Sequence, residues 1–216
     1  MNRLLIFLIP LMTSLSFCGI DAACQCKPHQ ILEDKIPCYN KRYGTFAIAL
    51  ELLSERNASI IVETGTARDG LSNCIGDGCS TIIFAEWAKE NKASVYSIDI
   101  SETNIKAAAS ALGEVPHVHL VCSDSVAFLK SFNHPIDFLY LDSYDYDIFK
   151  PNPSQKHHLK EIKAAYPRLT NKSVVMIDDS DRYLAGGGKG KLVMDYLLAR
   201  GWKILAEGYQ VILIKE

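Results

Sequence analysis

Five short apolar segments of this sequence each end at an acidic residue, and helix-like segments separate them. Apolar runs this short, without polar alternation, are typical of parallel strands that are covered on both faces. Ligands of such sheets bind beyond the carboxyl ends of the strands. The acids therefore predict a site at one sheet edge, suited to a cationic or hydroxyl-rich ligand or to a metal ion. They are Glu63, Asp99, Asp124, Asp142 and the pair Asp178–Asp179.

The order of segments predicts a Rossmann-like α/β fold: a doubly wound, mainly parallel seven-stranded sheet with helices on both faces. The last two strands are separated by three residues, short enough for a hairpin, so an antiparallel pair is expected at the C-terminus. One domain of this kind is predicted over residues 44–216. The predicted strands are 59–63, 94–98, 118–122, 136–141, 173–177, 203–206 and 210–214, and the predicted helices are 45–55, 80–91, 102–112, 125–132, 154–169 and 191–200.

Residues 1–23 have the character of a signal peptide or an N-terminal membrane anchor. Arg3 precedes an apolar run from Leu4 to Phe17, and small residues follow. A charged start, a short apolar stretch and a small-residue region form the pattern of an export signal, and the run is short for a membrane span. We expect an exported or membrane-anchored protein, which touches the membrane through this segment only. If the segment is not a functional signal, the protein is cytoplasmic. Residues 24–43 are predicted to be an irregular lead-in.

Charge and cysteine content indicate which partners and which cysteine states to expect. The formal net charge is −2 and no block of Lys or Arg occurs, which predicts that nucleic acid is not a partner. In an exported chain, Cys74 and Cys79 are suited to form a disulfide. Cys122 lies within an apolar strand and is expected to be a buried thiol.

A glycine loop follows the first predicted strand directly. Gly65 allows the backbone to approach a ligand closely, although a plain tight turn would use the same residue. Asp99 ends the second strand, 36 positions after Glu63. At this point, α/β nucleotide-binding folds place a carboxylate on ribose hydroxyls. The two features in this order predict a nucleotide-like cofactor.

With these motifs the chain resembles the class I S-adenosylmethionine-dependent methyltransferases, over residues 45–216 and including the terminal strand pair. The resemblance implies S-adenosylmethionine as the cofactor. In the family, the first glycine loop holds the methionine part, the second acid holds the ribose, and residues after the third strand meet the adenine. The corresponding positions here are Glu63, Gly65 and Thr66, then Asp99, then Ser123 and Asp124.

Asp142, Asp178 and Asp179 form an oxygen-only cluster at two neighbouring strand ends, which suits Mg²⁺ or another hard divalent cation. Three such acids would repel one another without a cation, although they could also only cap the following turns. The arrangement resembles metal-dependent O-methyltransferases of the catechol and antibiotic-sugar types. That resemblance implies a small hydroxylated acceptor held by the metal, with Asp142 and Asp145 as the catalytic residues and Asp145 as the general base.

Two further segments carry residues of chemical interest. Residues 186–190 are either a lid, in which Lys189 meets a substrate anion, or a plain linker. His157 and His158 are expected in the solvated start of a helix.

Two other functions compete with the methyltransferase prediction. Tyr146 and Lys150 have the spacing of a short-chain nicotinamide-dependent oxidoreductase, but Pro151 places them in a loop, where that spacing has no helical meaning. A non-catalytic or degenerate binding protein of the same fold is the other alternative, because an exported enzyme would be separated from cytosolic S-adenosylmethionine.

Overall fold

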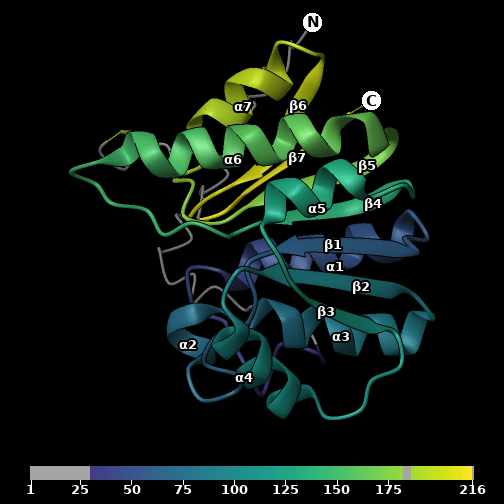
Figure 1. The fold of residues 1–216 in the computed structure, drawn as a ribbon. Coiled ribbons are helices and arrows are strands. Elements are labelled where there is room, and N and C mark those ends of the chain that lie inside the picture. The colour runs from purple at the N-terminus through teal and green to yellow at the C-terminus, as the bar shows by residue number, and fades with distance from the viewer. Residues whose placement is uncertain (1–29, 182–185, 216) are drawn as a thin grey trace, which may run out of the picture.

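One sheet of seven strands runs through the part of the chain that the computed structural model describes, residues 30–181 and 186–215 (Figure 1). Its order is β3-β2-β1-β4-β5-β7-β6, and only β7 runs antiparallel to its neighbours. The predicted fold class is therefore confirmed, whereas the proposed signal or anchor lies outside the described residues. The strands are β1 Ile60–Thr64, β2 Ser94–Asp99, β3 Val118–Cys122, β4 Ile136–Leu141, β5 Leu169–Ile177, β6 Trp202–Glu207 and β7 Val211–Lys215.

Helices cover both faces of the sheet. Helices α5, α6 and α7 cover one face, and α1, α3 and α4 cover the other (Figure 1). The four-residue helix α2 lies in the long loop between β1 and α3. The helices are α1 Tyr43–Glu55, α2 Cys74–Asp77, α3 Ser80–Asn91, α4 Glu102–Leu112, α5 Ser125–Ser131, α6 Pro151–Ala165 and α7 Lys191–Leu198, and a 3₁₀ turn spans Tyr166–Arg168.

Side chains alternate along each strand and therefore pack into two separate hydrophobic cores, one on each face of the sheet. Phe138 and Tyr140 of β4 face α1 and α3, while Leu139 and Leu141 face the opposite helices. All four are almost completely buried, which explains why the strand reads as a continuous apolar run. The observed pairing of β1 with β2 and with β4 brings the carboxyl ends of these strands to the same edge of the sheet.

Three local predictions need correction. The helix predicted from residue 154 begins at Pro151, because proline is well tolerated in the first turn of a helix. That helix ends at Ala165, and strand β5 already begins at Leu169. Cys122 is exposed and not buried, because β3 is an edge strand of the sheet.

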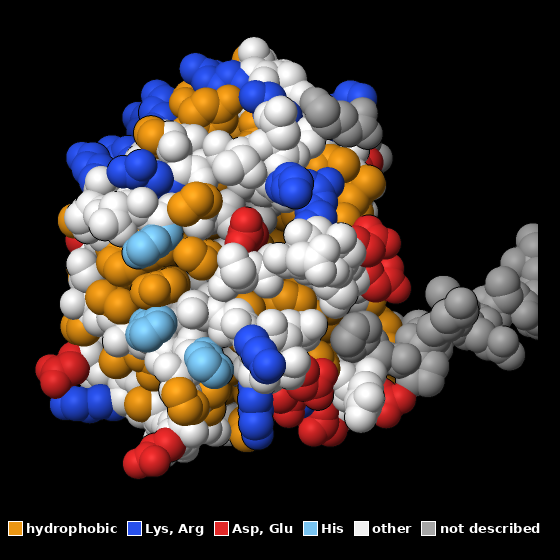
Figure 2. Space-filling model, turned by 90° about the vertical axis from the view of Figure 1, so that its right-hand side faces the viewer, with side chains coloured by type: hydrophobic (Ala, Val, Ile, Leu, Met, Phe, Trp, Pro, Cys, Tyr) orange, Lys and Arg blue, Asp and Glu red, His pale blue; other side chains and the backbone are white. Residues whose placement is uncertain are grey.

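The surface and the lead-in complete the description. On the face drawn in Figure 2, acidic and basic side chains are interspersed with apolar ones. Among the described residues, no helix has the length and apolarity to cross a membrane. Residues 30–42 form turns, as expected of a lead-in, but Leu32 and Ile36 are buried in the core shared with α1 and α3.

Candidate functional site

A cavity of about 490 Å³ lies at the carboxyl ends of the central strands. The loops that follow β1, β2, β4 and β5 all contribute to its wall, as the acid-ended strands predicted. A second cavity of about 220 Å³ adjoins it and shares Gly65, Asp99 and Tyr144 with it. Together they provide one elongated site with two compartments.

The glycine loop after β1 has no room for a side chain. Gly65 has φ +86°, and a Cβ there would lie 2.5 Å from the carbonyl oxygen of Asp142. Its amide donates to the carbonyl oxygen of Ile98 at 2.7 Å. The loop therefore lies tightly between the ends of β2 and β4, and only glycine fits this position.

Glu63 lies beneath this loop and does not line either cavity. Its Oε2 accepts hydrogen bonds from Thr81 Oγ1 at 2.7 Å and from Ser97 Oγ at 2.6 Å. Ser97 Oγ also lies 3.0 Å from Thr66 Oγ1, so the carboxylate supports the loop from below. Complete burial raises the pKa of Glu63 to about 7. The predicted contact of Glu63 with a cofactor stays a prediction.

The other predicted cofactor residues are divided between the two compartments. Thr66 lines the large cavity, Gly65 and Asp99 line both, and Asp124 lines the small one. Asp99 is oriented by the amide of Ser101, which donates to its Oδ1 at 2.7 Å. Asp124 caps α5 by accepting from the amide of Ala127 at 2.8 Å. Ser123 lines neither cavity.

The three acids predicted as metal ligands do meet. Asp142, Asp178 and Asp179 each offer a carboxylate oxygen within 4.8 Å of the others, and all three line the large cavity. Burial and the charge of Asp178 raise the pKa of Asp142 well above its ordinary value, and Lys189 opposes this shift.

Two buried cations of the chain itself already pair with these acids. Arg42, at the start of α1, forms a bidentate pair with Asp178: Nε donates to Oδ1 at 3.1 Å and Nη2 to Oδ2 at 2.8 Å. Lys189 Nζ donates to Asp142 Oδ1 at 2.5 Å and lies 3.1 Å from Asp179 Oδ2. The Lys189 side chain is only 1% exposed. Sequence reasoning did not find either pairing.

Neutral side chains also donate hydrogen bonds to the carboxylate oxygens of this cluster. Tyr209 Oη donates to Asp179 Oδ1, and Gln210 Nε2 donates to Asp178 Oδ1 at 2.8 Å. Burial acts to raise the pKa of Asp179, but Lys189 and Tyr209 outweigh it and leave that pKa below its ordinary value.

These contacts decide whether a divalent cation fits among the acids as they are arranged here. Within the described ranges, side chains bind five of the six carboxylate oxygens of the cluster, all but Asp142 Oδ2. A divalent ion on these oxygens would replace those contacts and would lie beside the Lys189 ammonium. The donor set is therefore that of a closed salt-bridge cluster and does not fit a metal site of open oxygen ligands.

Asp145, the predicted general base, lies on the rim of the large cavity. Its side chain is 78% exposed and pairs with Arg68 at 3.2 Å. Tyr146 and Lys150 lie in the same loop before α6, so they do not share a helix face.

A second buried carboxylate, which the sequence did not single out, supports the small cavity. Glu161 on α6 accepts hydrogen bonds from Ser125 Oγ at 2.5 Å and from Ser143 Oγ at 2.6 Å. It thereby joins the segments that follow β3 and β4. Burial acts to raise its pKa, but the hydrogen bond from His157 leaves it below its ordinary value.

The two histidines of α6 differ from expectation. His158 is completely buried, and burial lowers its pKa to about 4, so it is neutral. His157 lines the small cavity and lies 3.3 Å from Glu161. Neither occupies a solvated helix start, because α6 begins six residues before His157.

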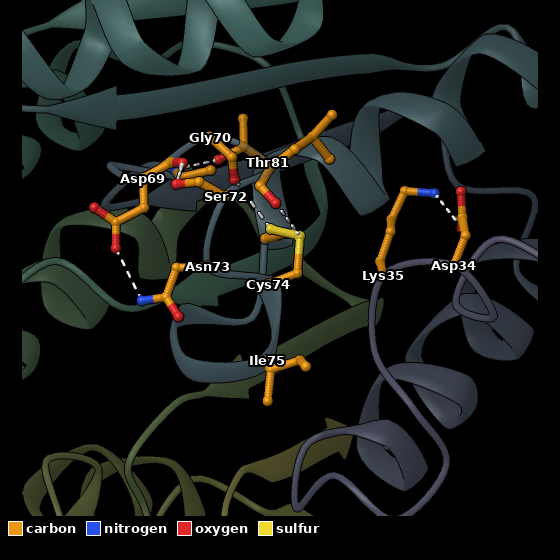
Figure 3. The surroundings of a disulfide bond; sticks show 12 residues. Asp34, Lys35, Asp69, Gly70, Ser72, Asn73, Cys74, Ile75 and Thr81 are labelled. Carbon is orange, nitrogen blue, oxygen red and sulfur yellow. Dashed lines mark hydrogen bonds and ion pairs between the residues drawn. A yellow bond between two sulfur atoms is a disulfide. The ribbon is translucent and has the colours of Figure 1, made fainter.

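A disulfide joins the start of α2 to the residue before α3, within the long loop that follows β1 (Figure 3). Cys74 and Cys79 are bonded, which confirms the predicted pair. Asn73 Nδ2 donates to Asp69 Oδ2 at 3.0 Å within the same loop. Gly76 and Asp77, between the two cysteines, line the large cavity, so the disulfide stabilises one wall of the site.

Comparison with known proteins supports the class that fold and site define. Residues 74–180 match the family model described as a methyltransferase domain, whereas no curated protein matches the sequence. Residues 74–180, just under half of the chain, therefore match a methyltransferase domain, and the sheet has the Rossmann-like form predicted for the class I methyltransferases.

Solved structures share this fold at low sequence identity. The O-methyltransferase NovP superposes with a TM-score of 0.60 at 13% identity, over 81% of this chain and 79% of that one. The SAH-bound methyltransferase PaMTH1 of Podospora anserina gives 0.57 at 14% identity, over 80% and 78%. MycE, from the mycinamycin biosynthetic pathway and solved with Mg, SAH and mycinamycin VI, gives 0.56 at 14% identity, over 80% of this chain and 48% of that one.

Proposed function

We propose that this protein is an S-adenosylmethionine-dependent methyltransferase that methylates a hydroxyl group of a small molecule. The observation that carries the proposal is the two-compartment site. The tight glycine loop and Asp99 form one side of it, and the acid cluster of Asp142, Asp178 and Asp179 forms the other. A nucleoside-containing cofactor needs such an elongated site beyond the strand ends.

The cofactor is assigned to both compartments. Gly65 and Thr66 receive its methionine part, and Asp99, which borders both cavities, accepts hydrogen bonds from the ribose hydroxyls. The adenine then lies in the small cavity beside Asp124 and His157. The apolar side chains of Ile98 and Ile100 in the wall of this cavity support the adenine assignment.

The acceptor is assigned to the acidic end of the large cavity. A hydroxyl group there would form the new O–CH₃ bond, while the electron pair of the broken C–S bond stays on the sulfur. The hydroxyl proton passes to a carboxylate, for which Asp142 lies deeper in the site than the exposed Asp145. Support for O-methylation comes from NovP, which is an O-methyltransferase. The closed salt-bridge cluster argues against metal assistance as the route of activation.

Calorimetric titration with S-adenosylmethionine tests the cofactor assignment. We expect binding to the wild type, and an affinity about 10- to 100-fold lower in Asp99→Ala, because a carboxylate that accepts hydrogen bonds is lost. Asp195→Asn, at an exposed position of α7, is the control for the loss of one charge. Equal affinities in Asp99→Ala and the wild type would remove the ribose assignment, and no binding to the wild type would remove the proposed function.

A non-catalytic exported protein of this fold is the competing proposal, and the disulfide is the observation that favours export. Transfer of a labelled methyl group from S-adenosylmethionine to hydroxylated acceptors distinguishes enzyme from binding protein. N-terminal sequencing of the mature protein tests export, because removal of a signal would expose a new start near residue 24.

A further inference from the structure

Lys189 supplies the acid cluster with a cation from the chain itself. We propose that its ammonium takes the place that a divalent metal would hold between Asp142 and Asp179, so that the site works without a metal ion. The inference rests on the proposed function, since it concerns how the acceptor end of that site is organised. Lys189 is a positioning residue: it does not line the cavity and acts through Asp142 and Asp179, which do.

The backbone around Lys189 is built to place this ammonium. The Lys189 amide donates to the carbonyl oxygen of Asp179 at 2.8 Å. The buried side chain of Gln155 donates to the carbonyl oxygens of Gly186 at 2.7 Å and Gly188 at 2.9 Å. The described part of this glycine-rich segment is therefore hydrogen-bonded to α6 and to the residues that follow β5, and neither a lid nor a plain linker describes it.

Glycine is required for that arrangement. Gly188 has φ +66°, and a Cβ there would collide with the backbone of Asp179 and Ser180. The close approach brings the Lys189 side chain under the acids, where it is 1% exposed. A lysine buried to this extent is costly unless its charge is paired, and here the pairing with two carboxylates is what makes the burial tolerable.

The charges of the cluster explain why an ammonium suffices. Arg42 pairs with Asp178 in a bidentate manner and lies only within 4.0 Å of Asp179 Oδ1, so Asp142 and Asp179 depend on a second cation for a close charge partner. Lys189 Nζ reaches both. A divalent ion at the same position would be repelled by this ammonium and by the Arg42 guanidinium.

Removal of the ammonium should therefore create a metal site. We compare wild type and Lys189→Ala by calorimetric titration with MgCl₂ and CaCl₂ and by thermal unfolding. We expect no binding heat and no change in Tm for the wild type. In Lys189→Ala, about 10 mM divalent cation should raise Tm by about 4 °C, if the new site has millimolar affinity. The double variant Lys189→Ala/Asp179→Asn should lose this response.

Lys191→Ala is the matched control, because Lys191 is half-exposed and pairs with Asp195 away from the site. It should gain no cation binding. A loss of packing alone would lower the Tm of Lys189→Ala but would not create an Asp179-dependent response to divalent cations.

Two results would overturn the proposal. One is metal binding by the wild type that Asp142→Asn abolishes, and the other is a folded Lys189→Ala that binds no divalent cation. If Lys189→Ala does not fold, the titration of the wild type with MgCl₂ and CaCl₂ decides alone. The absence of binding heat supports the proposal, and binding heat that Asp142→Asn abolishes contradicts it. Failure of the wild type to bind S-adenosylmethionine would refute the proposed function separately, since the metal titrations do not use the cofactor.

Discussion

Replacement of Glu63 by glutamine tests whether a buried carboxylate under the glycine loop controls the pH dependence of folding stability. Glu63 is completely buried, and its Oε2 accepts hydrogen bonds from Thr81 and Ser97. Burial raises its pKa to about 7 from an ordinary value of 4.5. Glutamine has nearly the same shape, and its amide oxygen can accept the same two hydrogen bonds, but it does not titrate.

The sign and size of the effect follow from the difference in pKa. Because the pKa is higher in the folded state, the folded protein binds this proton more tightly than the unfolded chain does. The stability that Glu63 contributes is therefore complete below pH 4.5 and is lost as the pH rises through about 7. At about 1.4 kcal/mol for each pH unit, the loss amounts to about 3 kcal/mol.

Urea unfolding of both proteins over a pH series measures this loss. The free energy of unfolding of the wild type, relative to Glu63→Gln, should fall by about 3 kcal/mol from about pH 4 to about pH 8. His158 is present in both proteins, so its own titration cancels in the difference. Glu114→Gln, at an exposed position, controls for the loss of one carboxylate. Parallel curves for wild type and Glu63→Gln would refute the reasoning.

Three other perturbations act on the walls of the site. Gly65→Ala places a Cβ 2.5 Å from a carbonyl oxygen of the loop after β4, so S-adenosylmethionine binding should be lost in calorimetry while circular dichroism still reports a folded protein. Arg42→Met leaves Asp178 as an unpaired buried charge and should lower the free energy of unfolding by about 3–5 kcal/mol in urea; an unchanged value would mean that the pair contributes nothing. Reduction of the Cys74–Cys79 disulfide should cost about 2 kcal/mol of stability and weaken cofactor binding, and equal affinities in oxidised and reduced protein would contradict a role in the wall.

Local patterns in the sequence were enough to predict the sheet and the edge at which the site lies. The apolar runs of β1 and β4 are buried on both faces, so their composition alone identifies them as central strands. The acids at their ends lie on one sheet edge because parallel strands in register end together. The terminal hairpin followed from a three-residue connection, and the disulfide from its two closely spaced cysteines.

The partners of those acids could not be predicted in the same way. Arg42 lies 136 residues from Asp178, and Lys189 lies 47 residues from Asp142. Neither belongs to a periodic segment, and a single lysine or arginine in a loop looks the same in sequence whether it is solvated or buried.

Burial after folding makes the difference. The start of α1 and the described part of the loop after β5 lie against the strand ends, and the carboxylates there, which are largely removed from water, accept hydrogen bonds from donors of the chain itself. The apolar and acidic segments of the sequence therefore determine where a ligand can bind. The net charge of that site depends on which distant cations the tertiary structure places beside the acids, and so does the need for a metal ion.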